Sequence, residues 1–160
     1  MKAILRSGFL VLAVMALTGP ANAGPYEDGL AAAERHDYAA ALKYWQRLAE
    51  QGNTKLQFTV GLIYYNGRDV PQDQTEAAKW FRLAAEQGDA RAQDSLGLMY
   101  EKGWGVGQDY LQALMWFNLA AMQGYEKAQK GRDFLARKMT PDQIAKAELI
   151  AREWMAKHRQ

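Results

Sequence analysis

Residues 53–88 read NTKLQFTVGLIYYNGRDVPQDQTEAAKWFRLAAEQG, and the next 36 residues, 89–124, read DARAQDSLGLMYEKGWGVGQDYLQALMWFNLAAMQG. Aligned position by position, the two segments are identical at 16 of 36 positions. Roughly two identities would be expected from composition alone. A period of this length is typical of stacked supersecondary units, each of which buries its apolar face against the next. The repeat therefore predicts a solenoid.

Parts of the same unit precede and follow the two complete copies. Asp37 and Ala41 lie 36 residues before Asp73 and Ala77, and Gln129 lies 36 residues after Gln93. We expect one domain, residues 24–160, with units at about 37–52 (partial), 53–88, 89–124 and 125–138 (partial), followed by a cap at 140–157.

Each complete unit is predicted to contain two helices. In the second half, Ala77, Trp80 and Ala84 recur at steps of three and four, which places them on one face of a helix. Asp73 and Asp109 are suited to N-caps, and Gly88 and Gly124 to left-handed C-terminal positions.

The first half of each unit, at about 54–65 and 90–101, carries a glycine inside a predicted helix. Glycine there costs about 1 kcal/mol relative to alanine. The return of Gly61 as Gly97 therefore indicates close helix approach.

The end of the chain carries a capping box, Thr140–Pro141–Asp142–Gln143, which begins a final helix to about Lys157. Terminal repeats must cover an apolar end. The residues expected to do so are Ile144, Ala147, Leu149, Ile150 and Trp154.

The first 23 residues have the pattern of a secretory signal peptide. Lys2 and Arg6 precede an apolar run at residues 8–17, which Gly19 and Pro20 interrupt before it could span a bilayer as an uncleaved anchor. We expect cleavage after Ala23, a periplasmic or secreted product, and no membrane insertion of the mature chain.

Composition excludes several classes of function. Without Lys2 and Arg6, the 20 basic residues fall to 18 and balance the 18 acidic ones, so no nucleic-acid role is indicated. The sequence contains no cysteine, which excludes disulfides and thiolate metal ligands. No residue spacing fits a metal or phosphate site, and no cofactor is expected.

Catalysis by a serine nucleophile would have to use Ser95, the one serine after residue 23, with His36 or His158 as the base. Ser95 is more simply a polar helix position, so we expect no enzyme activity.

The runs 64–73 and 77–88, with Trp80–Phe81 and Glu86–Gln87–Gly88 at fixed spacing, resemble the Sel-one-like repeat, a relative of the tetratricopeptide repeat. The chain departs from the pattern at Asp69, where the next unit has Gly105, and at Gly107, where the first has Pro71. The resemblance implies an all-α, right-handed superhelical solenoid and a role as an adaptor or scaffold, often in the bacterial envelope.

Some members of that family are linked to β-lactam binding or hydrolysis, but they carry a cysteine pair in each repeat. Because this chain has none, an envelope hydrolase of the β-lactamase-like type stays as the alternative function.

In the resembling superhelices, the first helix of each unit lines a concave groove that holds a protein or peptide partner. By the register of Gly61 and Gly97, the expected partner-binding residues are Lys55, Phe58, Leu62, Tyr65, Arg91, Asp94, Leu98, Glu101, Lys127 and Lys130, with Phe134 and Arg137 beyond them.

Phe58 and Tyr65 stand out in this set because one repeat later they are replaced by Asp94 and Glu101, so common packing does not require an aromatic there. Two alternatives are open: that the terminal helices bury these aromatics, and that the basic residues of the third unit form a solvated face. Trp104 is a further candidate, or it covers its own loop. The partner and the oligomeric state are not fixed by the sequence.

Overall fold

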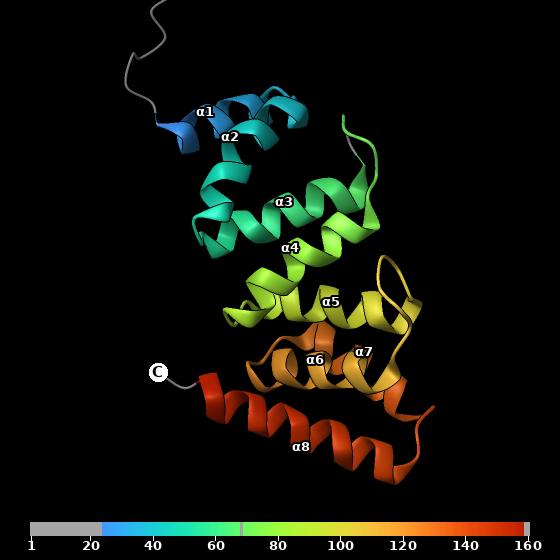
Figure 1. Ribbon diagram of the computed structural model, residues 1–160. Coiled ribbons are helices and arrows are strands. Elements are labelled where there is room, and N and C mark those ends of the chain that lie inside the picture. The colour runs from blue at the N-terminus through green and yellow to red at the C-terminus, as the bar shows by residue number, and fades with distance from the viewer. Residues whose placement is uncertain (1–23, 68, 159–160) are drawn as a thin grey trace, which may run out of the picture.

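The computed structural model describes residues 24–67 and 69–158, which form eight α-helices and no β-strand; the predicted signal peptide lies outside these residues. The helices are α1 (Pro25–Glu34), α2 (Tyr38–Glu50), α3 (Thr54–Asn66), α4 (Gln74–Glu86), α5 (Ala90–Lys102), α6 (Tyr110–Met122), α7 (Glu126–Ala136) and α8 (Pro141–His158). They stack in chain order (Figure 1), and each helix from α2 to α7 packs on the one before it. The predicted all-helical solenoid is confirmed.

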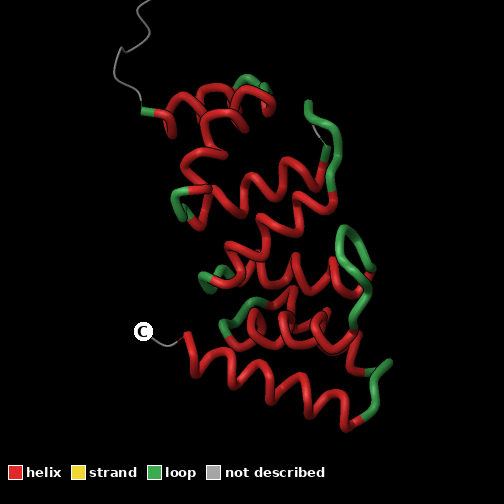
Figure 2. The backbone as a smooth tube through the Cα atoms, viewed as in Figure 1, coloured by secondary structure: helices red, strands yellow, loops and turns green. Residues whose placement is uncertain are grey.

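The expected start and stop signals are in place. The Asp73 carboxylate accepts a hydrogen bond from the backbone N–H of Glu76 at 2.9 Å, and Asp109 caps α6 in the same way. Gly88 and Gly124 have φ of 90° and 83°, as predicted. Turns within the two complete units are longer than those between units, and the two kinds lie on opposite sides of the stack (Figure 2).

The helical glycines mark close approach, as the sequence indicates. A Cβ atom on Gly61 would lie 2.7 Å from the ring of Phe81, and one on Gly97 would lie 2.9 Å from the ring of Phe117. Each glycine thus seats the phenylalanine of the second helix in its own unit, which brings the two helices together.

Helix α1 shows that the first unit is a complete helix pair, although the 36-residue register reveals only its second helix. A Cβ on Gly29 would lie 2.1 Å from the Trp45 indole, and Trp45 stands 36 residues before Phe81. The turn between α1 and α2 has three residues, whereas the one between α3 and α4 has seven. Because of this four-residue difference, Gly29 falls out of register with Gly61.

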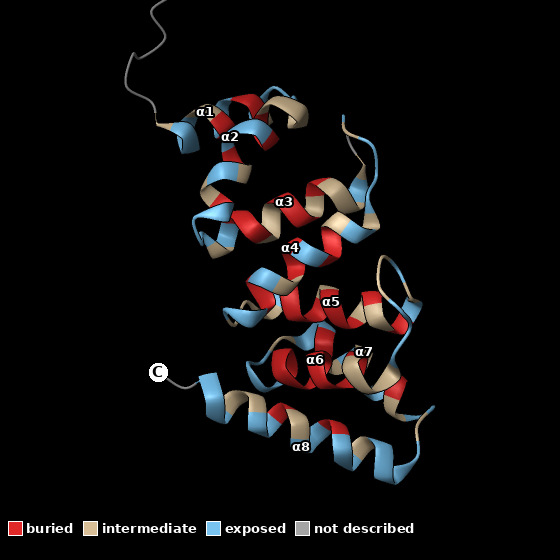
Figure 3. Cartoon of the chain, in the orientation of Figure 1, coloured by how far each residue is buried: buried red, intermediate tan, exposed pale blue. Residues whose placement is uncertain are grey.

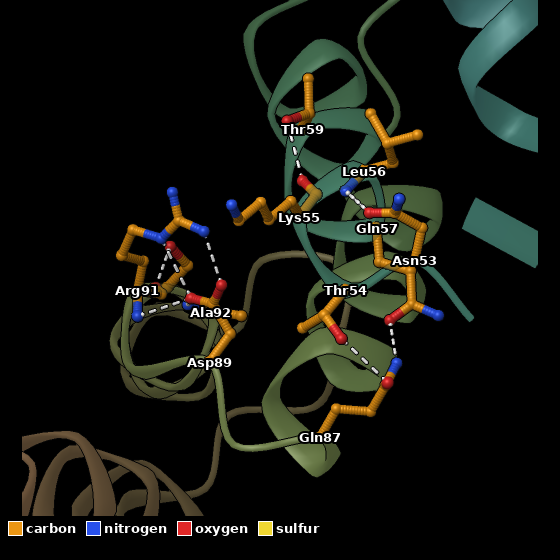
Figure 4. A network of polar contacts seen from close by, with 11 residues as sticks. Asn53, Thr54, Lys55, Leu56, Gln57, Thr59, Gln87, Asp89, Arg91 and Ala92 are labelled. Atoms are coloured by element: carbon orange, nitrogen blue, oxygen red, sulfur yellow. Dashed lines mark hydrogen bonds and ion pairs between the residues drawn. The ribbon is translucent and has the colours of Figure 1, made fainter. Parts of the chain in front are cut away.

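Buried glutamines join successive units in a repeated pattern. Gln57 donates to the backbone oxygen of Ala49 at 3.0 Å. It also accepts from the side chain of Gln87 at 2.6 Å, a bond that Figure 4 shows. Gln93 makes the same two bonds one repeat later, to the backbone oxygen of Ala85 at 3.1 Å and from Gln123 at 2.8 Å. The side-chain nitrogen and oxygen of both buried glutamines therefore each have a hydrogen-bond partner.

The loops of successive units also touch the preceding second helix. Asp69 has φ of 57°, and its carboxylate accepts from the N–H of Tyr38, the first residue of α2, at 3.5 Å. Gly105, one repeat later, has φ of 66° and sits against Gln74, the first residue of α4, where a Cβ would lie 2.1 Å from the backbone oxygen. The loop at Gly105 lies so close to the preceding second helix that it leaves no room for a side chain, whereas the loop at Asp69 leaves room for one. This difference in distance explains why one unit has glycine where the other has aspartate.

Helix α8 packs on α6, as expected for a cap. Ala147 and Ala151 are buried, Ile150 and Trp154 are half-buried, and the outer face is exposed (Figure 3). Leu149 is 50% exposed, so its expected role in the cap is wrong. The capping box is confirmed, because the backbone N–H of Thr140 donates to Gln143 Oε1 at 2.9 Å and that of Gln143 to Thr140 Oγ1 at 3.3 Å. Within the described ranges, no helix is long and apolar enough to cross a bilayer.

Candidate functional site

Two hollows lie side by side along the first helices of the units. The upstream hollow, of about 250 Å³, is lined by Ala33, Tyr38, Trp45, Thr59, Leu62, Ile63 and Asn66. The downstream hollow, of about 100 Å³, is lined by Leu62, Tyr65, Phe81, Asp94, Ser95, Leu98 and Lys127. Leu62 belongs to both walls, so the two hollows adjoin at this residue.

The two hollows are built from equivalent positions of the repeat. Trp45 and Phe81, Thr59 and Ser95, and Leu62 and Leu98 are pairs separated by 36 residues, and each pair contributes one member to each hollow. They differ in chemistry, since the upstream wall carries no ionisable group except Tyr38, whereas the downstream wall contains a carboxylate and an ammonium group.

Five of the ten expected partner-binding residues meet in the downstream hollow: Leu62, Tyr65, Asp94, Leu98 and Lys127. Two more lie together, because the Arg91 guanidinium sits over the Phe58 ring, 4.4 Å from its centroid. Lys55 and Lys130 are exposed on α3 and α7, and their ammonium groups form no ion pair or hydrogen bond within the described parts of the chain. The register therefore places most of these residues on one face.

Asp94 and Glu101 differ from the expectation that they point openly into a groove. They are only 4% and 5% exposed. Asp94 pairs with Lys127 at 3.6 Å, and Glu101 pairs with Lys102 at 2.9 Å. The seventh helix packs against α5 and covers part of this face, which sequence register alone does not reveal.

Burial and one neighbouring cation act on the Asp94 carboxyl in opposite directions. Desolvation raises its pKa above the ordinary value, and the Lys127 ammonium lowers it, with a net rise. The ionised Asp94 carboxylate therefore carries a desolvation cost that the Lys127 ammonium offsets only in part.

Phe58 and Tyr65 are half-buried, but the terminal helices do not cover them. Both rings pack on Phe81 of their own unit, with centroid separations of 5.6 Å and 6.2 Å. On the other side they meet the next unit, where Arg91 stacks on Phe58 and Trp104 lies 6.2 Å from Tyr65. Trp104 is 39% exposed and so adds an accessible indole beside Tyr65.

The third unit presents a basic surface around an exposed aromatic. Phe134 is 42% exposed, with Lys138 Nζ 4.1 Å and the Arg137 guanidinium carbon 5.8 Å from its ring centroid. The Phe134 ring thus helps to hold these two cations in place. Lys127, on the same helix, links this basic surface to the downstream hollow, whose wall it lines.

The candidate catalytic residues do not come together. Ser95 donates to the backbone oxygen of Arg91 at 2.9 Å, His36 is exposed in the turn after α1, and His158 stacks on Trp154 at the end of α8. Among the described residues, no group of three or more histidine and acidic side chains could hold a metal ion.

A larger hollow, of about 670 Å³, lies between the α4–α5 turn and the end of α8, and sequence reasoning missed it. Its wall includes Gln87, Gln93, Gln123 and Trp154. Two of these glutamines already bond to each other, and the charged members, such as Lys157, are exposed. It therefore lacks a desolvated charge of the kind that Asp94 supplies.

Comparison with known proteins matches the chain to the Sel1 repeat model at residues 21–53, 55–89 and 90–125. The crystal structure of c5321, a protective antigen present in uropathogenic Escherichia coli strains displaying an SLR fold, superposes with a TM-score of 0.77 at 30% identity. That match covers 84% of this chain but only 30% of the antigen.

A Sel1 repeat protein from Oxalobacter formigenes superposes with a TM-score of 0.63 at 34% identity, over 68% of this chain and 85% of that one. No curated protein sequence matches. Sel1 repeat proteins are generally protein-interaction scaffolds and are typically not enzymes. With three repeats matched over more than half of its length, the chain belongs to the Sel1 repeat family.

Proposed function

We propose that this protein is an exported adaptor that holds a protein or peptide partner along the face formed by its two adjacent hollows. The observation that carries the proposal is the shared wall at Leu62, which joins an apolar hollow to a charged one. Concave sites with apolar walls and few polar groups are the usual form of ligand pockets.

The accessible aromatic groups on this face support the same role. Trp104 is exposed beside Tyr65, and Phe58 is half-buried beneath Arg91. Tryptophan, tyrosine and arginine are the residue types that most often dominate binding energy at protein interfaces. The proposal of export rests on the sequence of residues 1–23 and places the partner in the bacterial envelope or outside the cell.

Affinity capture from the envelope fraction, with mass spectrometry, tests the proposal through a pair of double variants. Phe58→Ala with Tyr65→Ala should lower recovery of the partner at least tenfold while helical circular dichroism is retained. Tyr44→Ala with Leu83→Ala is the matched control, because both side chains are exposed on second helices, at 42% and 43%.

Retained capture by the Phe58/Tyr65 variant, with loss in the Tyr44/Leu83 variant, would place the interface on the second helices and overturn the proposal. N-terminal sequencing of the captured bait tests export in the same preparation, and the expected first residue is Gly24.

A further inference from the structure

The Asp94 carboxylate is a buried charge that the fold does not require. The equivalent position is Phe58 in the preceding unit and Lys130 in the following one, so the shared packing of the repeats does not depend on an acid here. At 4% exposure, Asp94 is nevertheless almost fully removed from water. A charge in such a place is costly unless a close partner compensates it.

The present partner of Asp94 is a weak one. Lys127 Nζ lies 3.6 Å from Oδ2, and the Lys127 side chain is 72% exposed. The neighbouring hydroxyl of Ser95 donates to the backbone of Arg91 instead. Because an ionised carboxylate can accept about four hydrogen bonds, Asp94 retains most of its acceptor capacity. The Lys127 side chain lies mostly in water, so another cation can take its place.

The walls around Asp94 fit the rest of a basic side chain. Leu62 and Leu98 line the hollow on α3 and α5 and offer apolar contact for an aliphatic stem. The ring of Tyr65 lines the same hollow, and aromatic rings attract cations. The molecule already uses this kind of contact nearby, since Arg91 lies 4.4 Å above the Phe58 ring.

We infer that the downstream hollow is a specificity pocket for an arginine or lysine side chain of the partner, which pairs with Asp94 and displaces Lys127. The inference rests on the proposed function and adds the chemistry of the partner: a basic side chain at this hollow, next to an apolar one at the upstream hollow.

A titration with small probes tests the pocket without the natural partner. The full mature chain is titrated with N-acetyl-arginine methylamide and, as the uncharged isostere, N-acetyl-citrulline methylamide, following the backbone amide signals of Leu62, Asp94 and Leu98 by NMR. The arginine probe should bind roughly fivefold or more tightly than the citrulline probe, because only the former makes a charge-assisted bond to the carboxylate.

Three variants sharpen the test. Asp94→Asn should abolish the preference for arginine, whereas Lys127→Ala should strengthen arginine binding roughly threefold, because it removes the competing ammonium group. Asp133→Asn, which alters an exposed acid on α7, should change nothing. Equal binding of the two probes, a preference that survives in Asp94→Asn, or weaker binding in Lys127→Ala would each overturn the inference.

Asp94→Asn and Lys127→Ala are expected to change arginine binding in opposite directions. Each variant therefore tests the inference by itself if the other folds poorly. Probe binding without partner capture would refute the adaptor role and leave the pocket standing. Partner capture without probe selectivity would do the reverse.

Discussion

The units at residues 53–88 and 89–124 share their internal packing and differ in what they present outward. Both seat a phenylalanine on a helical glycine, and both join to the preceding unit through a buried glutamine. They differ at Phe58 against Asp94 and at Asp69 against Gly105. The first difference changes the chemistry of a hollow, whereas the second is dictated by backbone contact. Divergence between repeats therefore has two distinct physical origins.

The largest effect is expected at Gly105, where we attribute the difference between the two units to a backbone contact. We expect Gly105→Ala to lower the free energy of unfolding by about 3 kcal/mol, because a left-handed non-glycine residue is strained and the added Cβ would meet a carbonyl oxygen. That oxygen belongs to Gln74 in α4, 2.1 Å from the position of the Cβ. Urea denaturation followed by circular dichroism measures the loss.

Two companion variants show whether the loss is specific. Gly107→Ala introduces a Cβ with no atom within 4 Å, and Asp69→Gly places the residue of the later unit in the earlier one. Both should change the free energy of unfolding by no more than about 0.5 kcal/mol. A loss in Gly107→Ala as large as in Gly105→Ala would show that the contact with Gln74 is not the cause of the loss.

An intermediate effect is expected where the two units agree, at the buried glutamines. Gln93→Ala should cost about 2 kcal/mol, because it leaves a backbone oxygen and the amide of Gln123 without their partner. Gln129, the equivalent residue in α7, is half-buried and makes no side-chain hydrogen bond within the described parts of the chain. Gln129→Ala should therefore cost under about 0.5 kcal/mol by thermal unfolding, and equal losses would contradict the boundary role of Gln93.

The 36-residue period predicts the helical glycines and the helix caps that recur in each complete unit. It does not predict helix α1, which is out of register with that period. Gly61, Gly97 and the caps of α4 and α6 followed from periodicity, because each is a local requirement that returns every 36 residues. The helix α1 was missed because a shorter turn moves Gly29 out of register.

At the site, register placed Leu62, Tyr65, Asp94, Leu98 and Lys127 on one face. It did not give the burial of Asp94, because that depends on how closely α7 approaches α5. The burial of Glu101 was not predicted either. Nor did identity between repeats reveal that Gln57 and Gln93 bond across unit boundaries, since a recurring glutamine looks the same whether it is exposed or buried.

The smallest expected effect separates two aspartates of α5 and its cap by their dependence on pH. Burial raises the pKa of Asp94 above 3.8, so the folded state binds its proton more tightly than the unfolded state. Stability is then lost as the pH rises from about 3.8 through the raised pKa. Burial alone would also raise the pKa of Asp89, but hydrogen bonds from Arg91 and the N–H of Ala92 lower it below 3.8. Its stabilisation is present above that value and is lost as the pH falls through the lowered pKa.

The two asparagine variants should therefore depart from the unmodified chain in opposite directions. At about pH 7, Asp94→Asn should be more stable and Asp89→Asn less stable, each by about 0.5 kcal/mol, and both differences should shrink as the pH approaches about 3. Asparagine also caps helices well, so the Asp89 variant reports mainly on the pairing with Arg91. Thermal unfolding at the two pH values measures both. If Asp94→Asn proved less stable at neutral pH, the Lys127 pair would outweigh the burial of Asp94. The carboxylate would then stabilise the fold, as Gln93 does. The difference between Phe58 and Asp94 would in that case reflect packing and not the chemistry of the hollow.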